Sequence, residues 1–147
     1  MKKVAIGNDH GGVEYKNEII KRLGDRYDFI NCGTDTLDSC DYPDFAFKVG
    51  ELVRDNKASF GIVICKSGIG VSIAANKVKG VRCALVYFKE NAALARKHND
   101  ANVLAFGVNN NSINEIIDMI IAYDSETFET RHQRRIDKIT NYESKKV

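Results

Sequence analysis

The sequence predicts an α/β fold in which a five-stranded parallel sheet is covered by helices on both faces. Two observations support this prediction. Short apolar runs recur along the chain, and each is followed by a segment that is compatible with a helix. Strands that alternate with helices pair in parallel through right-handed crossovers, which places helices on both faces of the sheet.

The first half of the chain predicts two strand–helix units. The first strand covers residues 4–6, and the helix after it carries an apolar stripe made of Tyr15, Ile19, Ile20 and Leu23. The second strand covers residues 28–33. A helix over residues 45–53 follows, because Pro43, the single proline of the chain, suits a helix start.

The second half of the chain predicts three further strands, over residues 60–64, 81–87 and 102–107. A helix-compatible segment follows each of them. The clearest apolar stripe lies after the last strand and consists of Ile113, Ile116, Ile117, Ile120 and Ile121. Residues 127–147 are expected to form a final helix with a frayed, basic end.

Composition indicates one domain over residues 1–147 and excludes several classes of function. A hydrophobic fraction of 44% with 29% charged residues is ordinary for a globular protein, and no apolar stretch approaches the roughly 18 residues that span a membrane. A net charge of +2 provides no strong field for nucleic acid. The start of the chain resembles no signal peptide, so we expect a cytoplasmic protein without nucleic-acid or membrane partners.

The four cysteines, Cys32, Cys40, Cys65 and Cys83, have no Cys-x-x-Cys spacing. A chain with a full core does not need disulfides, and this spacing argues against structural zinc.

Candidate functional residues lie just after the strands, because ligands of open parallel sheets bind beyond the carboxyl ends of the strands. The loop from Ser67 to Gly70 precedes a helix whose first N–H groups are unpaired. Such a loop either holds a phosphate or developing oxyanion, or is a plain tight turn. Its spacing matches neither a Gly-Lys-Ser/Thr phosphate loop nor a Gly-x-Gly-x-x-Gly dinucleotide motif.

Each candidate side chain has a functional and a structural interpretation. Cys65 is either a small core residue or a thiolate activated by a helix N-terminus and Lys66. His10 and His98 are expected near one edge of the sheet, as acid–base groups or as ordinary surface or core histidines. Arg131 and Arg135, one helical turn apart, form either a phosphate clamp or a solvated basic face.

Five motifs occur in order over about residues 3–140. They are Gly7-Asn8-Asp9-His10-Gly11-Gly12, Asp41-Tyr42-Pro43, Cys65-Lys66-Ser67-Gly68-Ile69-Gly70 with Ser72-Ile73-Ala74-Ala75-Asn76-Lys77, His98-Asn99-Asp100-Ala101-Asn102-Val103, and Arg131-His132-Gln133-Arg134-Arg135. Together they closely resemble the motifs of the type B ribose-5-phosphate isomerase family, which includes allose-6-phosphate and galactose-6-phosphate isomerases.

The resemblance implies a Rossmann-like three-layer sandwich and an enzyme that interconverts aldose and ketose sugar phosphates through a cis-enediolate. Such an enzyme is an intramolecular oxidoreductase that uses no metal and no cofactor. The implied substrates are D-ribose 5-phosphate and D-ribulose 5-phosphate, of the pentose phosphate pathway. The alternatives are allose 6-phosphate or galactose 6-phosphate as substrate, and a phosphosugar-binding module without catalysis.

The resemblance also implies roles for individual residues. Cys65 is the base at the sugar C2, Ser67 relays protons between O1 and O2, and His98 with Asp9 opens the furanose ring. The residues expected to bind substrate are His10, Tyr42, Gly68, Ile69, Gly70, Asn99, Arg131 and Arg135. The family forms homodimers and often tetramers. Its site is shared across the interface, with His98 and some arginines coming from the second subunit, which the segment 127–147 is expected to reach.

Three positions depart from the family pattern. Lys66 stands where relatives usually have glycine, Asn109 stands where many carry a phosphate-binding arginine, and Ser67 replaces a more common threonine. The hydroxyl needed for the relay is retained. Lys66 alters the loop or adds charge beside the enediolate, and the missing arginine is expected to lower phosphate affinity unless another cation compensates.

Overall fold

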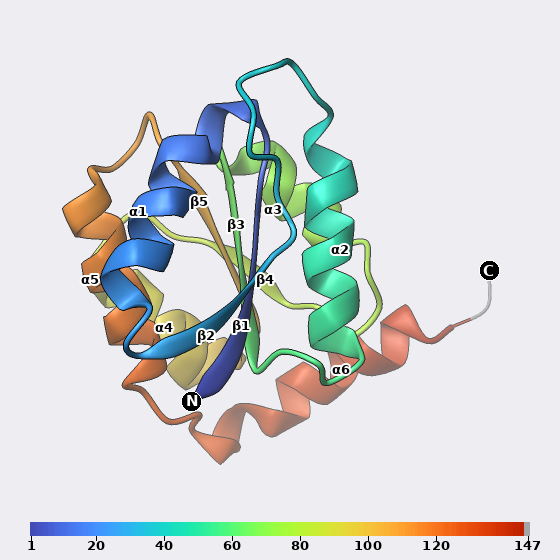
Figure 1. Cartoon of the computed structure of the whole chain (residues 1–147). Coiled ribbons are helices and arrows are strands. Elements are labelled where there is room, and N and C mark those ends of the chain that lie inside the picture. The colour runs from blue at the N-terminus through green and yellow to red at the C-terminus, as the bar shows by residue number, and fades with distance from the viewer. Residues whose placement is uncertain (146–147) are drawn as a thin grey trace.

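The structure is a computed structural model, and it describes residues 1–145 (Figure 1). The sheet consists of β1 (Lys2–Asn8), β2 (Tyr27–Asn31), β3 (Phe60–Cys65), β4 (Cys83–Leu85) and β5 (Val103–Gly107). All four pairings are parallel, in the order β2-β1-β3-β5-β4. The predicted fold class is confirmed.

Helices cover both faces of the sheet (Figure 1). One face packs against α1 (Val13–Leu23), α4 (Lys89–Asn99) and α5 (Ile113–Asp124), and the other against α2 (Tyr42–Arg54) and α3 (Ile69–Ala75). The short helices η1 (His10–Gly12) and η2 (Thr130–His132) precede α1 and α6 (Gln133–Glu143). Figure 1 shows α6 beyond the amino ends of the strands. Within residues 1–145, no helix has the length and apolar character that crossing a bilayer requires.

The two faces of the sheet differ in the size of their side chains. Ile6, Ile62 and Phe106 point into the core beneath α1 and α5, whereas Ala5 and Ala105 point toward α2 and α3. A Cβ added at Gly61 would lie 2.4 Å from Cγ1 of Val49 in α2. Small residues on this face therefore let α2 and α3 approach the sheet closely, and this places the start of α3 over the end of β3.

Several boundaries differ from the expected ones. β4 has three residues instead of seven, because the Val81 N–H donates to Val78 in a turn and the Arg82 N–H donates to the Asn102 side chain. α2 begins at Tyr42, which places Pro43 in its first turn. The C-terminal segment forms η2 and then α6, and the end of the expected tail, residues 146–147, lies outside the described residues.

Candidate active site

The strand order changes direction between β1 and β3, since the chain continues from β1 to β2 on one side and from β3 toward β5 and β4 on the other. Asp9 and His10 directly follow β1, and Cys65 ends β3. The Asp9 N–H donates to the Ile64 carbonyl at 3.3 Å, which joins the two strand ends. Such a point, at the carboxyl edge of the sheet, is where open α/β sheets bind their ligands.

Cys65 lies beneath the turn that leads into α3. Its side chain is 6% exposed, and Sγ accepts a hydrogen bond from the Gly68 N–H at 3.1 Å. Gly68 has a φ of 78°, and a Cβ there would lie 2.6 Å from Leu85 Cδ1. Glycine is thus required at position 68 by both backbone conformation and space. The turn aims a backbone N–H at the sulfur, where it stabilises negative charge.

Two of the other cysteines are poor nucleophiles. Burial raises the pKa of the Cys32 thiol, and it raises the pKa of the Cys83 thiol to about 12. Both side chains therefore stay protonated at neutral pH. All four cysteines are free thiols.

The loop after Cys65 is held by its own side chains and by the segment after β5. Ser67 Oγ accepts a hydrogen bond from the Ile69 N–H at 3.2 Å, and Asn110 Nδ2 donates to the Ser67 carbonyl at 2.8 Å. The N–H groups of Ser67 and Gly70 donate no hydrogen bond to any residue within 1–145. Of the four loop N–H groups, those of Gly68 and Ile69 therefore already donate to nearby side chains, and those of Ser67 and Gly70 are available to a ligand.

Asn110 was missed by sequence reasoning, although it lies in the segment after Phe106, which the strand-end rule singles out. Its side-chain bond to Ser67 and the bond from the Val108 N–H to the Cys65 carbonyl, at 3.0 Å, attach the loop to the end of β5.

Three further predicted residues lie at the same edge. Tyr42, at the start of α2, packs on Gly70, where an added Cβ would lie 2.6 Å from its ring. Asp9 is 7% exposed, and its Oδ1 accepts the Gly11 N–H at 3.0 Å. Nδ1 of His10 accepts the Cys40 N–H at 3.4 Å, so the neutral ring carries its proton on Nε2.

Lys66 is exposed, and its side chain lies over η1. A Cβ added at Gly11 would be 2.8 Å from Lys66 Cγ and 3.3 Å from Asp9 Oδ1. Lys66 forms no ion pair with any residue from 1 to 145. Its carbonyl accepts the Asn109 N–H at 2.9 Å, so two of the three positions that depart from the family pattern are neighbours at this edge.

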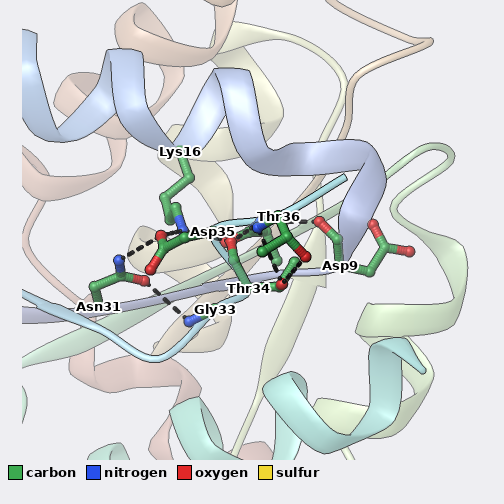
Figure 2. Close-up of polar contacts among 8 residues, drawn as sticks. Asp9, Lys16, Asn31, Gly33, Thr34, Asp35 and Thr36 are labelled. Atoms are coloured by element: carbon green, nitrogen blue, oxygen red, sulfur yellow. Dashed lines mark hydrogen bonds and ion pairs between the residues drawn. The ribbon is translucent and has the colours of Figure 1, made fainter. Parts of the chain in front are cut away.

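Lys16 anchors the loop after β2 and was not predicted from the sequence (Figure 2). Its side chain is fully buried beneath α1, and Nζ donates to the Thr34 carbonyl at 2.6 Å and pairs with Asp35. The hydrogen bond from Lys16, with another from Asn31, lowers the pKa of Asp35. The available signal was that Lys16 falls on the apolar face of α1, three residues before Ile19.

His98 and Asn99 end α4, immediately before β5 begins. The expectation that His10 and His98 share one edge of the sheet is therefore wrong. A crossover helix runs antiparallel to its strands, so its last residues return to the amino edge. Cys65 pairs with Gly107 and Gly61 pairs with Val103, so β5 separates the two edges by roughly 13 Å, at about 3.3 Å a residue.

A compact polar cluster surrounds His98 at the amino edge. Nε2 of His98 lies 3.4 Å from Oε1 of Glu129, and the rings of His98 and His132 are 4.6 Å apart. The Glu129 N–H donates to the Lys97 carbonyl at 2.9 Å, which attaches this segment to α4. Glu129 was not predicted, and His132 was seen only as part of the arginine motif.

Neighbouring charges and burial shift the pKa values of Glu129 and His132 in this cluster. A hydrogen bond from Arg131 lowers the pKa of Glu129. Burial and the charge of Arg131 lower the pKa of His132, so its imidazole is neutral at pH 7. Nε2 of His132 is buried and has no hydrogen-bond partner among the residues of the described chain.

Arg131 and Arg135 also lie on the amino-edge side, and both are exposed. Arg131 belongs to η2, where its Nε lies 3.3 Å from Oε2 of Glu129, and Arg135 belongs to α6. The expectation that the two arginines lie one turn apart on a single helix is wrong, because a short 3₁₀ turn precedes α6.

The predicted site residues thus form two groups in one chain. The carboxyl-edge group consists of Asp9, His10, Tyr42, Cys65, Ser67, Gly68, Ile69 and Gly70. The amino-edge group consists of His98, Asn99, Arg131 and Arg135. The structure brings residues together within each group, and it does not bring the two groups together.

Comparison with known proteins gives a consistent family. Residues 4–139 match the family model described as Ribose/Galactose Isomerase. Ribose-5-phosphate isomerase B of Escherichia coli is 40% identical over 149 residues, which cover 99% of each chain. The structure of the Clostridium thermocellum ribose-5-phosphate isomerase B has a TM-score of 0.93 at 43% identity, over 96% of this chain and 97% of that one.

A further match is ribose-5-phosphate isomerase B from Mycoplasma genitalium with bound ribulose-5-phosphate. Its TM-score is 0.93 at 41% identity, over 98% of this chain and 97% of that one. With a family model matched along nearly the whole sequence and relatives of this similarity, the chain belongs to the ribose/galactose isomerase family.

Proposed function

We propose that this chain is an aldose–ketose isomerase that interconverts D-ribose 5-phosphate and D-ribulose 5-phosphate, a step of the pentose phosphate pathway. Its family and its similarity to a structure with bound ribulose-5-phosphate support the choice of this substrate pair. The observation that carries the chemistry is the Cys65 sulfur, which lies at the β1/β3 edge with the Gly68 N–H aimed at it and Asp9 on the neighbouring strand end.

Cys65 acts as the base of the proton transfer. Its thiolate removes the proton from C2 of the open-chain aldose, the electron pair forms the C1–C2 double bond, and the carbonyl oxygen becomes the enediolate oxygen. The free N–H groups of the loop bind this oxygen. The Ser67 hydroxyl moves the proton between O2 and O1, and the thiol returns its proton to C1. C2 is oxidised and C1 is reduced in the same molecule, so the scheme needs no cofactor.

The remaining residues open the ring and hold the substrate. Asp9 of one chain and His98 of the partner subunit transfer the protons of ring opening. Tyr42 of the first chain and Asn99 of the partner subunit line the sugar site. His10, with its proton on Nε2, donates to the phosphate. Arg131 and Arg135 of the partner subunit supply the positive charge.

The site is completed by a second copy of the chain. In one chain the Cys65 group and the His98 group face opposite edges of the sheet, so no bound sugar phosphate reaches both. A two-fold dimer that brings the amino edge of one chain to the carboxyl edge of the other forms two complete sites. We therefore propose a homodimer.

An apolar surface along β4 suits this association. β4 is an edge strand, and a groove of about 610 Å³ runs beside it, with Leu85, Leu94 and Ile139 in its lining. Ile73 and Tyr142 nearby are 58% and 75% exposed. An open strand edge with large exposed apolar side chains is typical of a surface that a partner covers.

Two further parts of the proposal concern organisation and location. A single sheet with a core on each face supports one isomerase domain. Free thiols at all four cysteines are compatible with the reducing cytoplasm, where we place the enzyme.

Turnover of three substrates tests the proposal. The purified chain is assayed with ribose 5-phosphate, allose 6-phosphate and galactose 6-phosphate, and we expect the highest kcat/KM with the pentose. The Cys65→Ala variant should lose turnover while it keeps its fold and its affinity for a phosphosugar inhibitor. Cys32→Ala is the matched control and should remain active.

Three outcomes decide between the alternatives. An active Cys65→Ala enzyme contradicts the mechanism. A higher kcat/KM with a hexose phosphate changes the substrate and retains the mechanism. Calorimetric binding of the pentose phosphate without turnover by the wild-type chain supports a binding module in place of an enzyme.

A further inference from the structure

The cluster of His98, Glu129 and His132 is built like a metal-binding site. One ligand atom from each residue lies within 4.8 Å of the other two, and all three side chains are partly buried. The residues come from the last turn of α4 and from the segment that ends in η2. The Glu129 N–H donates to the Lys97 carbonyl at 2.9 Å, which joins the two segments, and the His132 N–H donates to the Glu129 carbonyl at 3.1 Å, which fixes the turn between these two ligands.

The distances fit a small divalent cation. In tetrahedral coordination with bonds of about 2.0–2.1 Å, neighbouring ligand atoms are roughly 3.4 Å apart. Nε2 of His98 and Oε1 of Glu129 are already separated by 3.4 Å. The third ligand needs a side-chain adjustment of about 1 Å, because all three ligand atoms lie within 4.8 Å of one another.

The donor chemistry also fits. Nε2 of His132 is a buried ring nitrogen without a partner among residues 1–145. Arg131 occupies Oε2 of Glu129, which leaves Oε1 directed at His98. Two imidazoles and one carboxylate are ligands that Zn²⁺ prefers, and three protein ligands leave a coordination position for water.

We propose that His98, Glu129 and His132 form an inhibitory binding site for a divalent transition-metal ion, with Zn²⁺ as the best match. The ion occupies Nε2 of His98, and this nitrogen then no longer transfers a proton. The nearby charges of Arg131, Arg135 and Lys97 oppose a cation, so binding is reversible and weaker than at a structural zinc site. The inhibition rests on the proposed role of His98 in ring opening, whereas the binding does not.

Direct binding measurements separate these two parts. Zn²⁺ affinity and stoichiometry are measured on the full chain by competition with a chromogenic chelator, and the visible absorption of the Co²⁺-loaded chain reports its ligands. We expect one ion per chain. Glu129→Gln and His132→Gln should each weaken binding by about tenfold or more. Glu126→Gln, three residues before Glu129 and outside the cluster, is the matched control and should bind as wild type does.

The kinetic arm uses each variant's own metal-free rate as its reference. Zn²⁺ should inhibit the wild type and Glu126→Gln at the concentrations at which it binds, and Glu129→Gln should need about tenfold more. Affinity that is unchanged in both cluster variants overturns the proposal, and so does binding that disappears only in Cys65→Ala and shows a thiolate-to-cobalt band. Cluster-dependent binding without inhibition overturns the inhibitory role and retains the site.

Discussion

Cys65 and His98 lie at opposite edges of the sheet within one chain. Cys65 ends β3, which pairs with the end of β5, and His98 ends α4 just before β5 begins. The length of β5 separates the two edges. The residues that are predicted to act together in one site therefore lie apart within a single chain.

Mixing two inactive variants should restore activity. Cys65→Ala removes the base from one edge, and His98→Asn removes the imidazole from the other, so each homodimer has two defective sites. A mixed dimer has one intact site, which combines Cys65 from one chain with His98 from the other. After equal mixing with subunit exchange, about a quarter of wild-type activity should return, because half of the dimers have one site of two intact. No recovery, with exchange confirmed by mass spectrometry, would contradict the shared site.

Replacing Gly68 should impair catalysis as well as stability. Gly68→Ala forces a side chain into a left-handed conformation against Leu85 and the Phe106 backbone, so the N–H that points at Cys65 shifts. We expect kcat to fall about 100-fold, as for loss of a donor in an oxyanion site. Gly80→Ala is the matched control, since Gly80 has a φ of 85° with its nearest neighbour at 3.9 Å.

Gly80→Ala should cost about 1–2 kcal/mol of unfolding free energy through its backbone conformation and leave kcat unchanged. Equal loss of kcat in both glycine variants would show that the backbone conformation alone, and not the contact with Cys65, determines the effect.

Lys66→Met should raise KM with little change in kcat. The Lys66 side chain lies over η1 beside Gly11 and forms no ion pair among the described residues, so its charge is available to a substrate phosphate. We expect KM to rise several-fold, which corresponds to about 1 kcal/mol of binding free energy. We also expect KM to depend less strongly on salt concentration. Lys21→Met, on the exposed side of α1, is the control and should leave KM unchanged. An unchanged KM in Lys66→Met would show that Lys66 does not contribute to substrate binding.

Lys16→Met should loosen the loop after β2 and change the acid sensitivity of the protein. Lys16 is fully buried and donates to the Thr34 carbonyl, so its loss should cost about 1–3 kcal/mol of unfolding free energy at pH 7. Its hydrogen bond holds the pKa of Asp35 below the ordinary 3.8. That contribution to stability is present above about pH 4 and is lost as pH falls through the lowered pKa.

Denaturant unfolding of the wild type and Lys16→Met across pH 3–7 measures this effect. The stability difference between the two should be largest near neutral pH and should shrink below about pH 4. Lys21→Met should differ from wild type by less than about 0.5 kcal/mol throughout. A difference that stays constant with pH would mean that Lys16 acts by packing and not through Asp35.

The fold could be predicted because local signals agreed with one another. Apolar runs alternating with helical stripes predict parallel strands, and the strand-end rule selected the segments after β1, β3 and β5, which the structure places at one edge of the sheet. Tyr42 was assigned to the site by the family resemblance alone. The boundaries of β4 were wrong because its pairing depends on the Asn102 side chain, which is distant in sequence.

The arrangement of the site could not be predicted from spacing alone. His98 was assigned to the wrong edge because the direction of a crossover helix, and not the position of a residue next to a strand, decides where its last turn lies. Lys16 was missed because a buried lysine depends on a distant partner, Asp35. Glu129 lies outside the quoted motifs, and its contact with His98 exists only after the C-terminal segment docks on α4.

Under the proposed shared site, the separation of Cys65 from His98 would make catalytic output depend on chain concentration. A lone chain would then lack a complete site, so well below the dissociation constant of the proposed dimer the amount of active enzyme is expected to scale with the square of chain concentration. A twofold change in chain level then changes flux about fourfold. If the site is shared as proposed, dilution alone would inactivate the enzyme without any effector.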